Sequence, residues 1–482
     1  MITINRNIQS EILMTTMDEI VPEDSLFRKI DKYIDFTFIY DKVKDLYCEN
    51  NGRPSIDPVV LFKMVFIQAL DGIKSMRQTC KKLKVDAEYR WFLGIPFSQD
   101  TPHFSTFSKN YERRFKDSDI FEEIFIEIVN QAIKYKLVDG TTFYTDSTHK
   151  KANANKNKFN DEIVKNVKER RKWLEDEINE ERIKQGRKTF EYEDEIEEKH
   201  IKVSTTDKES GYYHRDNKEK GFMYLDHRTV DDKCNIIVDA YITKGNVHDS
   251  GPFISRAEYI KNKFGFDIKK YAVDSGYLTL DIKKYFIENS IFGVFGYRRY
   301  GTPESRKEKS KYKYEKELDI YYEKETGEIL EYKGLIDKNG YKKYENTDKT
   351  KIVRRHIHEE WNEIFKENRL SKEGKELYQK RKEHIERSFA DSKQNHGYRY
   401  AMYKGVKKNQ HYTWLICAAQ NMKNISIKND NVGKKPLTSS FIYNFTKIIK
   451  NIISLNKKFI HEKTSRKNLG VCLHSEKNPR FF

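Results

Sequence analysis

Two aspartates close short runs of residues that have the composition of β-strands. The run at 141–146 ends at Asp146, the run at 271–274 ends at Asp274, and small polar residues follow both. Strand ends border the crevice of an open sheet, where ligands and metals are held, and carboxylate oxygens are the ligands that Mg²⁺ prefers. A single aspartate there is often only a helix N-cap, but two such acids in one sheet favour a metal site.

A third acid, Glu386, lies in a helix predicted over residues 371–393. At 3.6 residues per turn, one face of that helix carries four polar residues, Tyr378, Lys382, Glu386 and Lys393. Cations one turn before and two turns after a carboxylate suit a site that holds metal and phosphate together. Ordinary salt bridges along a helix produce the same pattern, so this segment alone leaves both interpretations open.

The elements around these acids predict an α/β fold with a mixed sheet. From residue 141 the order is a strand ending in an acid, a two-stranded hairpin at 221–242, a helix, a second strand ending in an acid, a helix and a strand at 291–297. Helices that alternate with strands in this way pack against one sheet. Residues 119–300 are therefore predicted to form the first part of a core, with a charged helical connector at 156–200.

The rest of the chain predicts four further segments. Residues 1–118 predict an all-α domain, 301–365 a β-rich insertion, 366–430 the second part of the core with the Glu386 helix, and 431–482 a basic tail. Within the N-terminal domain, helices at 75–83 and 86–93 around a tight turn have helix-turn-helix spacing. Their cations Arg77, Lys81 and Lys82 are then available for DNA phosphates. A packing or dimerisation unit with a solvated basic face is an equally good interpretation.

The charge of the chain is concentrated near its C-terminus. The net charge is +17, and residues 391–430 contribute +5 while 431–482 contribute +9. A concentrated basic region is typical of a polyanion binder, although lysine is abundant throughout this sequence. We expect no membrane span, because the apolar runs are too short, and no signal peptide. The five cysteines are scattered, which suggests reduced thiols and a cytoplasmic location.

The helix around Glu386 resembles the Tyr-Arg-Glu-Lys signature of bacterial insertion-sequence transposases of the DDE class. Tyr378 and Arg381 match the spacing of that signature, as do Glu386 and Lys393. Four residues rather than three separate the Arg from the Glu, and Lys382 occupies the usual register of the Arg. The blocks at 144–148, 246–250, 274–277 and 397–400 also resemble that family, and the similarity spans roughly residues 21–421.

The resemblance implies an RNase H-like core split by an insertion, with Asp146, Asp274 and Glu386 as catalytic, metal-binding residues. Two Mg²⁺ ions, for which Mn²⁺ can substitute, would lie about 3.5–4 Å apart. We expect Asp146 to bridge both ions, and the other two acids to complete one shell each. Further predicted roles are DNA positioning by Tyr378, Arg381 or Lys382, and Lys393, with supporting roles for His248 and Asp249.

The expected function is that of a DNA transposase, which cuts transposon ends and joins them to target DNA. The expected partners are double-stranded DNA and a second copy of the chain, since two ends must be paired, in a bacterial cytoplasm at the nucleoid. A nuclease that does not rejoin, a regulator that no longer cuts and a small-phosphoester hydrolase remain alternatives. End recognition is open between the helical domain, the insertion and the tail. Residues 397–404 interleave aromatics with cations, which suits base stacking but also ordinary core packing.

Overall fold

The computed structural model describes residues 14–48, 54–214, 219–298 and 302–436. The chain divides into two compact units, one formed by Met1–Leu137 with Leu415–Phe482 and the other by Val138–Trp414. Most of the predicted basic tail, from residue 437, lies outside the described residues. None of the helices in the described ranges combines the length and apolar composition needed to span a membrane.

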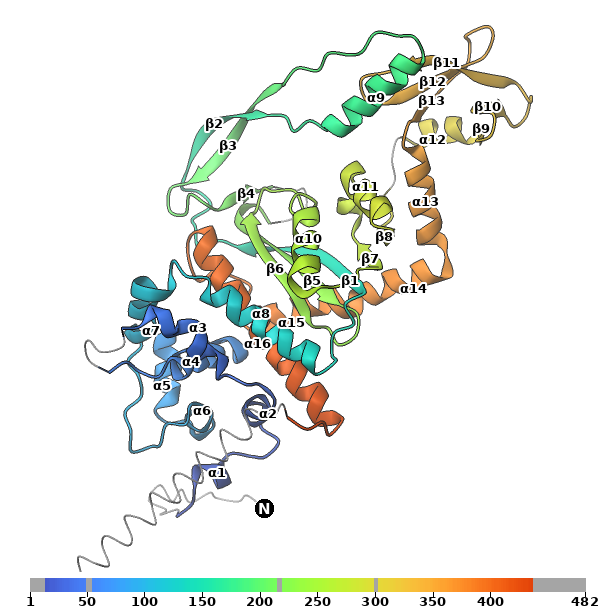
Figure 1. Ribbon diagram of the computed structural model, residues 1–482. Helices are drawn as coiled ribbons and strands as arrows, with labels where there is room; N and C mark the ends of the chain where they lie inside the picture. The colour runs from blue at the N-terminus through green and yellow to red at the C-terminus, as the bar shows by residue number, and fades with distance from the viewer. Residues whose placement is uncertain (1–13, 49–53, 215–218, 299–301, 437–482) are drawn as a thin grey trace, which may run out of the picture. The chain divides into compact units, whose positions relative to one another are not determined.

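The elements described in the first unit are helices (Figure 1). Its centre is α4 (Pro58–Leu70), which Asp57 caps and in which every residue from Leu61 onward is buried. Proline at the first helical position fits because its missing N–H has no partner there anyway. The other helices are α1 (Met17–Ile20), α2 (Leu26–Tyr33), α3 (Phe38–Val43), a 3-10 turn (Lys44–Leu46), α5 (Met76–Leu83), α6 (Ala87–Leu93), α7 (Ser105–Asn110) with a π turn (Tyr111–Phe115), α8 (Ile120–Lys134) and the later part of α16 (Val406–Asn431).

The second unit is built on a mixed six-stranded sheet. The strand order is β4-β5-β1-β7-β8, with β6 also paired to β5. β1 is antiparallel to β5 and parallel to β7, which is parallel to β8. The strands are β1 (Thr142–Lys151), β4 (Gly211–Tyr213), β5 (Gly221–Asp231), β6 (Ile237–Lys244), β7 (Lys270–Val273) and β8 (Phe292–Phe295). The mixed α/β arrangement predicted from the sequence is confirmed.

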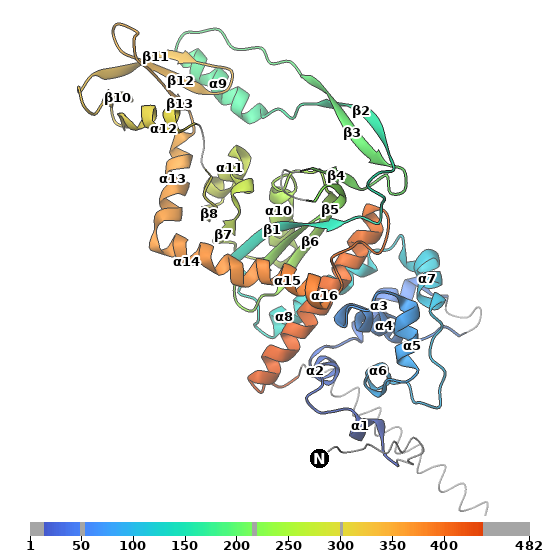
Figure 2. The same ribbon diagram turned by 180° about the vertical axis from the view of Figure 1, so that it is seen from behind.

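Helices cover both faces of this sheet (Figures 1 and 2). On one face, α10 (Phe253–Phe264) and α11 (Leu280–Glu288) pack their phenylalanines on Tyr271 of β7. The other face is covered by a helix running through α14 (Lys372–Arg381), a π turn (Lys382–Glu386) and α15 (Arg387–Asn395). The sheet is thus the middle layer of three.

The insertion between β8 and α14 carries a second sheet. Its antiparallel strands have the order β13-β12-β11-β10-β9. Their side chains form a small core that includes Tyr344 and Leu330. They are β9 (Tyr312–Glu315), β10 (Ile320–Glu323), β11 (Ile329–Ile336), β12 (Tyr341–Glu345) and β13 (Ile352–His356), flanked by α12 (Pro303–Ser310) and α13 (Glu359–Leu370). All five strands lie within the range that the sequence predicted to be β-rich.

The connector at 156–200 differs from its prediction as a helical segment. Only α9 (Lys172–Lys184) is helical, and β2 (Phe159–Val167) pairs antiparallel with β3 (Ile196–Ser204) on either side of it. Most residues of this two-stranded ribbon are exposed. A strand that buries neither face needs no alternation of polar and apolar residues, so its charge-rich sequence resembled a solvated helix.

Candidate active site

Asp146 and Asp274 are neighbours on adjacent parallel strands. Thr145 of β1 lies opposite Val273 of β7, so each aspartate follows the last residue of the parallel pairing. The strand β7 ends there, as predicted, whereas β1 continues past Asp146 and stays paired with β5. The prediction that a strand ends at Asp146 is therefore corrected, since only its pairing with β7 ends.

The helix that carries Glu386 packs on the face of β1 to which Asp146 points. The His384 ring stacks on Tyr144 with centroids 4.7 Å apart. Tyr144 and Asp146 point to the same face because side chains alternate along a strand. The π turn is therefore held directly against the strand that bears the first acid.

This π turn accounts for the unusual spacing of Arg381 and Glu386. It absorbs one residue more than an α-helical turn, so the two side chains meet across the turn. Nη1 of Arg381 lies 3.4 Å from Oε1 of Glu386. Arg381 is buried while Lys382 is exposed, so Arg381, and not the residue in the usual register, contacts the acids.

Shortening the π turn by one residue tests this account. Deleting Glu383 leaves three residues between Arg381 and Glu386, which a regular α-helix places on one face, so we expect helix content, and the DNA cleavage that the sequence predicts, to be retained. Deleting Gln379 instead rotates Tyr378 by about 100° relative to Arg381, and we expect a loss of about hundredfold in cleavage rate. Circular dichroism and cleavage of a labelled DNA end measure both, and equal losses for the two deletions would contradict the account.

Arg381 lies between two of the acids. Its Nη2 donates a hydrogen bond to Oδ2 of Asp146, and its Nη1 donates to Oε1 of Glu386. The side chain of Arg381 is only 8% exposed, whereas that of Glu386 is 48% exposed. The guanidinium therefore offsets part of the negative charge concentrated here, and Glu386 is linked to Asp146 through Arg381.

Burial raises the pKa of Asp146 to about 6. The carboxylates of Asp274 and Asp249 raise the pKa further, while Arg381 and the backbone N–H of Ser147 lower it. A raised pKa means that this environment disfavours the ionised acid. Even with Arg381 in place, burial leaves the ionised carboxylate of Asp146 disfavoured.

Asp274 lies in a narrow space beside Tyr378 and Gly296. The Tyr378 hydroxyl donates to Oδ1 of Asp274 at 3.5 Å. A Cβ atom at Gly296 would lie 2.7 Å from that hydroxyl and 2.9 Å from the same carboxylate oxygen. Contacts this short are repulsive, so glycine at the end of β8 leaves the room that Asp274 and Tyr378 occupy.

Lys393 reaches the strand of Asp146 from the far end of the same helix. Its Nζ donates to Oγ1 of Thr148 at 2.5 Å, and Thr148 shares a face of β1 with Asp146. Burial lowers the pKa of Lys393. A partly desolvated cation at this position suits contact with an anionic group next to the acids.

A buried ion pair that the sequence analysis missed fixes the Glu386 helix to the sheet. Arg228 and Asp226 of β5 are both fully buried, and Arg228 Nη2 lies 2.8 Å from Asp226 Oδ2. Arg228 Nη1 also donates to the hydroxyl of Ser392 on α15 at 2.7 Å. The only signal in the sequence is a run of polar residues, 226–229, inside an otherwise apolar strand, which by itself also suits an exposed strand.

The two weaker candidates, His248 and Asp249, have different surroundings. Asp249 accepts a hydrogen bond from Ser147 at 2.7 Å and lies near enough to Asp146 to raise its pKa. His248 is exposed and contacts Ser250 at 2.7 Å, within its own loop. The structure therefore brings only Asp249 to the acids.

The cations predicted in the N-terminal domain lie on α5 of the first unit. Arg77, Lys81 and Lys82 are all exposed, and Arg77 also stacks over the Phe104 ring at 4.4 Å. The buried residues of α5 are Thr79, Cys80 and Leu83. The helix therefore turns its basic face to solvent.

The acids are not arranged as a complete metal centre. Among the described residues, no three His, Cys, Asp or Glu side chains are grouped so that they could hold a metal ion. Two aspartates lie side by side, and Glu386 adjoins them across the Arg381 guanidinium. The arrangement is that of three carboxylates gathered around one buried guanidinium.

Comparison with protein families identifies transposase domains in two parts of the chain. The family described as Transposase domain (DUF772) matches residues 15–113, and the Transposase DDE domain matches residues 338–426, which include Glu386. These matches support a DNA transposase function, and the second supports an enzyme that acts on DNA.

No curated protein matches the chain. The solved structure of a piggyBac transposase synaptic complex with hairpin DNA aligns with 95% of this chain and 85% of that one, at 11% identity and a TM-score of 0.32. That level of similarity does not establish a common fold.

Proposed function

We propose that the chain is a DDE-type insertion-sequence transposase in which Asp146, Asp274 and Glu386 hold two divalent metal ions. The observation that carries the proposal is the register of β1 and β7, which places two acids side by side. The Glu386 helix packs against the first of these strands. A sheet with β5 antiparallel and β7 parallel to β1 further supports an RNase H-like core.

The residues at the site fit Mg²⁺ or Mn²⁺. All three donors are carboxylates, and these metals prefer hard oxygen ligands. A pair of such ions activates the attacking oxygen and stabilises the leaving oxygen in phosphodiester cleavage and joining. The raised pKa of Asp146 supports this fit, because it reports an environment in which added positive charge stabilises the ionised acid.

The chain's own cations position the DNA. Arg381 offsets the acids in the free protein, and once they have another partner its planar guanidinium can bind a phosphate through two donors. Tyr378 and Lys393 flank the acids on either side along the same helix. The exposed face of α5, with Arg77, Lys81 and Lys82, provides further phosphate contacts. A homodimer in the DNA complex follows from the need to pair two transposon ends.

A strand-transfer assay tests the proposal. The purified chain is incubated with Mg²⁺, a plasmid and labelled DNA from either side of its gene, both intact and pre-cut to leave a 3′-OH. A transposase cuts the intact end and joins the pre-cut end to the plasmid. Cutting without joining would identify a nuclease, and binding without either reaction would identify a regulator.

A further inference from the structure

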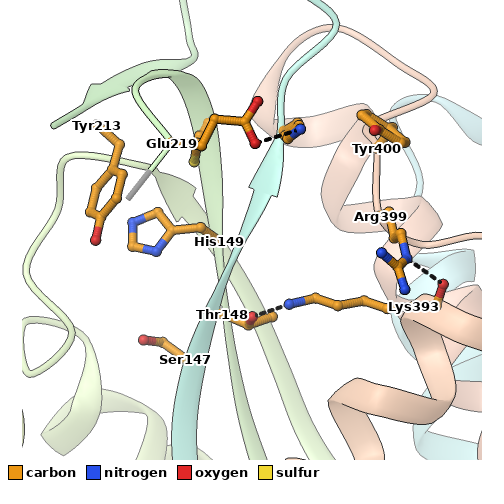
Figure 3. Close-up of a pocket in the computed structure, with 10 residues that line it drawn as sticks. Ser147, Thr148, His149, Tyr213, Glu219, Lys393, Arg399 and Tyr400 are labelled. Carbon is orange, nitrogen blue, oxygen red and sulfur yellow. Dashed lines mark hydrogen bonds and ion pairs between the residues drawn. The ribbon is translucent and has the colours of Figure 1, made fainter. Parts of the chain in front are cut away.

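A groove starts beside Asp146 and follows one edge of β1. β7 pairs with this edge of β1 only up to Thr145. Beyond Thr145, no other strand in the described part of the chain pairs with this edge until Lys151, which forms a bridge to Tyr400. The groove measures about 500 Å³, the size of a ligand-binding cleft. Its lining includes Thr148, Lys151, Tyr213, Lys393, Arg399 and Tyr400 (Figure 3).

Cations are spaced along this groove. Figure 3 shows Lys393, Arg399 and then Tyr400 in succession on one wall. Nε of Arg399 donates to the backbone oxygen of Lys393 at 3.4 Å, which leaves the exposed guanidinium end turned to the groove. Among the described residues of the lining the one acid is Glu219, which is paired with Lys151 at 2.6 Å. The wall is therefore suited to a chain of phosphates rather than to a single one.

The two tyrosines of the segment 397–400 have different surroundings. Tyr398 is fully buried and stacks on Tyr412 in the core. Tyr400 is 59% exposed and lies in the groove. An exposed ring between cations gives a flat surface on which a nucleic-acid base can stack.

Tyr400 also lines a second cavity. That second cavity measures about 580 Å³, and its lining includes Tyr400, Ala152, Asn153 and the exposed Lys404. Tyr400 borders both cavities, so together they form a track that leads away from Asp146. A duplex keeps its bases stacked on one another, whereas an unpaired strand can stack a base on Tyr400 and place phosphates on Lys393 and Arg399.

We propose that this track binds an unpaired stretch of the DNA strand that continues from the scissile phosphate. The inference rests on the proposed function, because it takes Asp146 to mark the scissile position. Arg399 and Lys393 neutralise successive phosphates, and Tyr400 stacks on a base. The enzyme therefore prefers ends whose last base pairs are open.

Binding of two DNA ends by the full chain tests the inference. One is a blunt duplex and the other carries a short unpaired arm, and fluorescence anisotropy is measured without divalent cations. Tyr400→Ala is expected to weaken binding of the forked end by about fivefold or more, with little change for the duplex, and Tyr400→Phe to retain it. Arg399→Gln is expected to lower the salt dependence of fork binding by about 0.7 in log–log slope.

The control is Tyr341→Ala, an exposed tyrosine of the insertion, outside the groove. We expect it to affect both DNAs equally or not at all. The inference is overturned if Tyr400→Ala leaves fork binding unchanged, or weakens fork and duplex binding alike. Asp146→Asn tests the proposed function separately from the track. If that variant still cleaves DNA, the enzymatic assignment is wrong. A loss of the preference for forked DNA in Tyr400→Ala would support the track even then.

Discussion

Replacing Asp146 by Asn is expected to abolish metal-dependent cleavage and joining of DNA. Asn keeps the size of the side chain but cannot supply a charged ligand. Loss of metal stabilisation worth several kcal/mol lowers the rate by about a thousandfold or more, since about 1.4 kcal/mol corresponds to tenfold. The rate of cleavage of a labelled end in Mg²⁺, and calorimetric titration with Mn²⁺, measure the two consequences separately.

Glu386→Gln is expected to behave like Asp146→Asn, and Glu383 provides its matched control. Glu383 is exposed on the same π turn, so Glu383→Gln should retain cleavage and Mn²⁺ binding. Unfolding midpoints of the three variants establish that each one folds. Normal cleavage by Glu386→Gln would remove that residue from the proposed site and leave the two aspartates without their third acid.

Metal binding should also depend on pH in the range set by Asp146. Its pKa in the metal-free protein is raised to about 6, so the carboxylate is ionised above that pH and protonated below it. A protonated acid cannot ligate a metal. Mn²⁺ affinity is therefore expected to be constant above about pH 7 and to fall as the pH drops through 6, with calorimetry at several pH values as the measurement. Affinity that rises on acidification would contradict this assignment.

The positions of the two aspartates could be predicted from the sequence because the signal is local. A short run of β-branched and aromatic residues followed by an acid and small polar residues specifies a strand and the point where its pairing changes. Even so, β1 extends beyond Asp146. Its later half is polar because Thr148 contacts Lys393 and, with its neighbours, lines the groove, surroundings that only the folded chain defines.

The role of Arg381 could not be settled from the sequence, because spacing rules assume a regular α-helix. With 3.6 residues per turn, Lys382 falls on the face of Glu386, and the π turn changes that register. Nothing local specifies a π turn here. The stacking of His384 on Tyr144, a contact between residues far apart in the chain, is part of what holds it in place.

Charge patterns were the least reliable guide to structure. The connector at 156–200 and strand β5 both carry clusters of charged residues, yet the first forms an exposed ribbon and the second is buried along its whole length. Strand β5 can be buried because its charged residues Arg228 and Asp226 neutralise each other inside the protein. A buried charge is tolerated only when it is paired, and the sequence does not reveal the pairing.

Breaking the buried ion pair of Arg228 and Asp226 is the second change for which we expect a large effect, in this case on stability. Arg228→Met is expected to lower the free energy of unfolding by about 3–5 kcal/mol, because it leaves the fully buried carboxylate of Asp226 without its partner. Urea unfolding measures the loss. The control is Arg170→Met, since Arg170 pairs with Glu175 near the surface and its loss is expected to change the free energy of unfolding little.

The double variant Asp226→Asn with Arg228→Met distinguishes charge from packing. Removing both charges should recover most of the lost stability, because replacing a buried pair costs far less than breaking it. The helix at Ser392 would still lose its hydrogen bond from Arg228, so hydrogen exchange in α15 should stay faster than in the wild type and DNA cleavage should stay reduced. If the double variant recovered both stability and cleavage, Arg228 would serve only to neutralise Asp226; if it recovered neither, packing of the long side chain against Phe389 and Tyr398 would be the larger contribution.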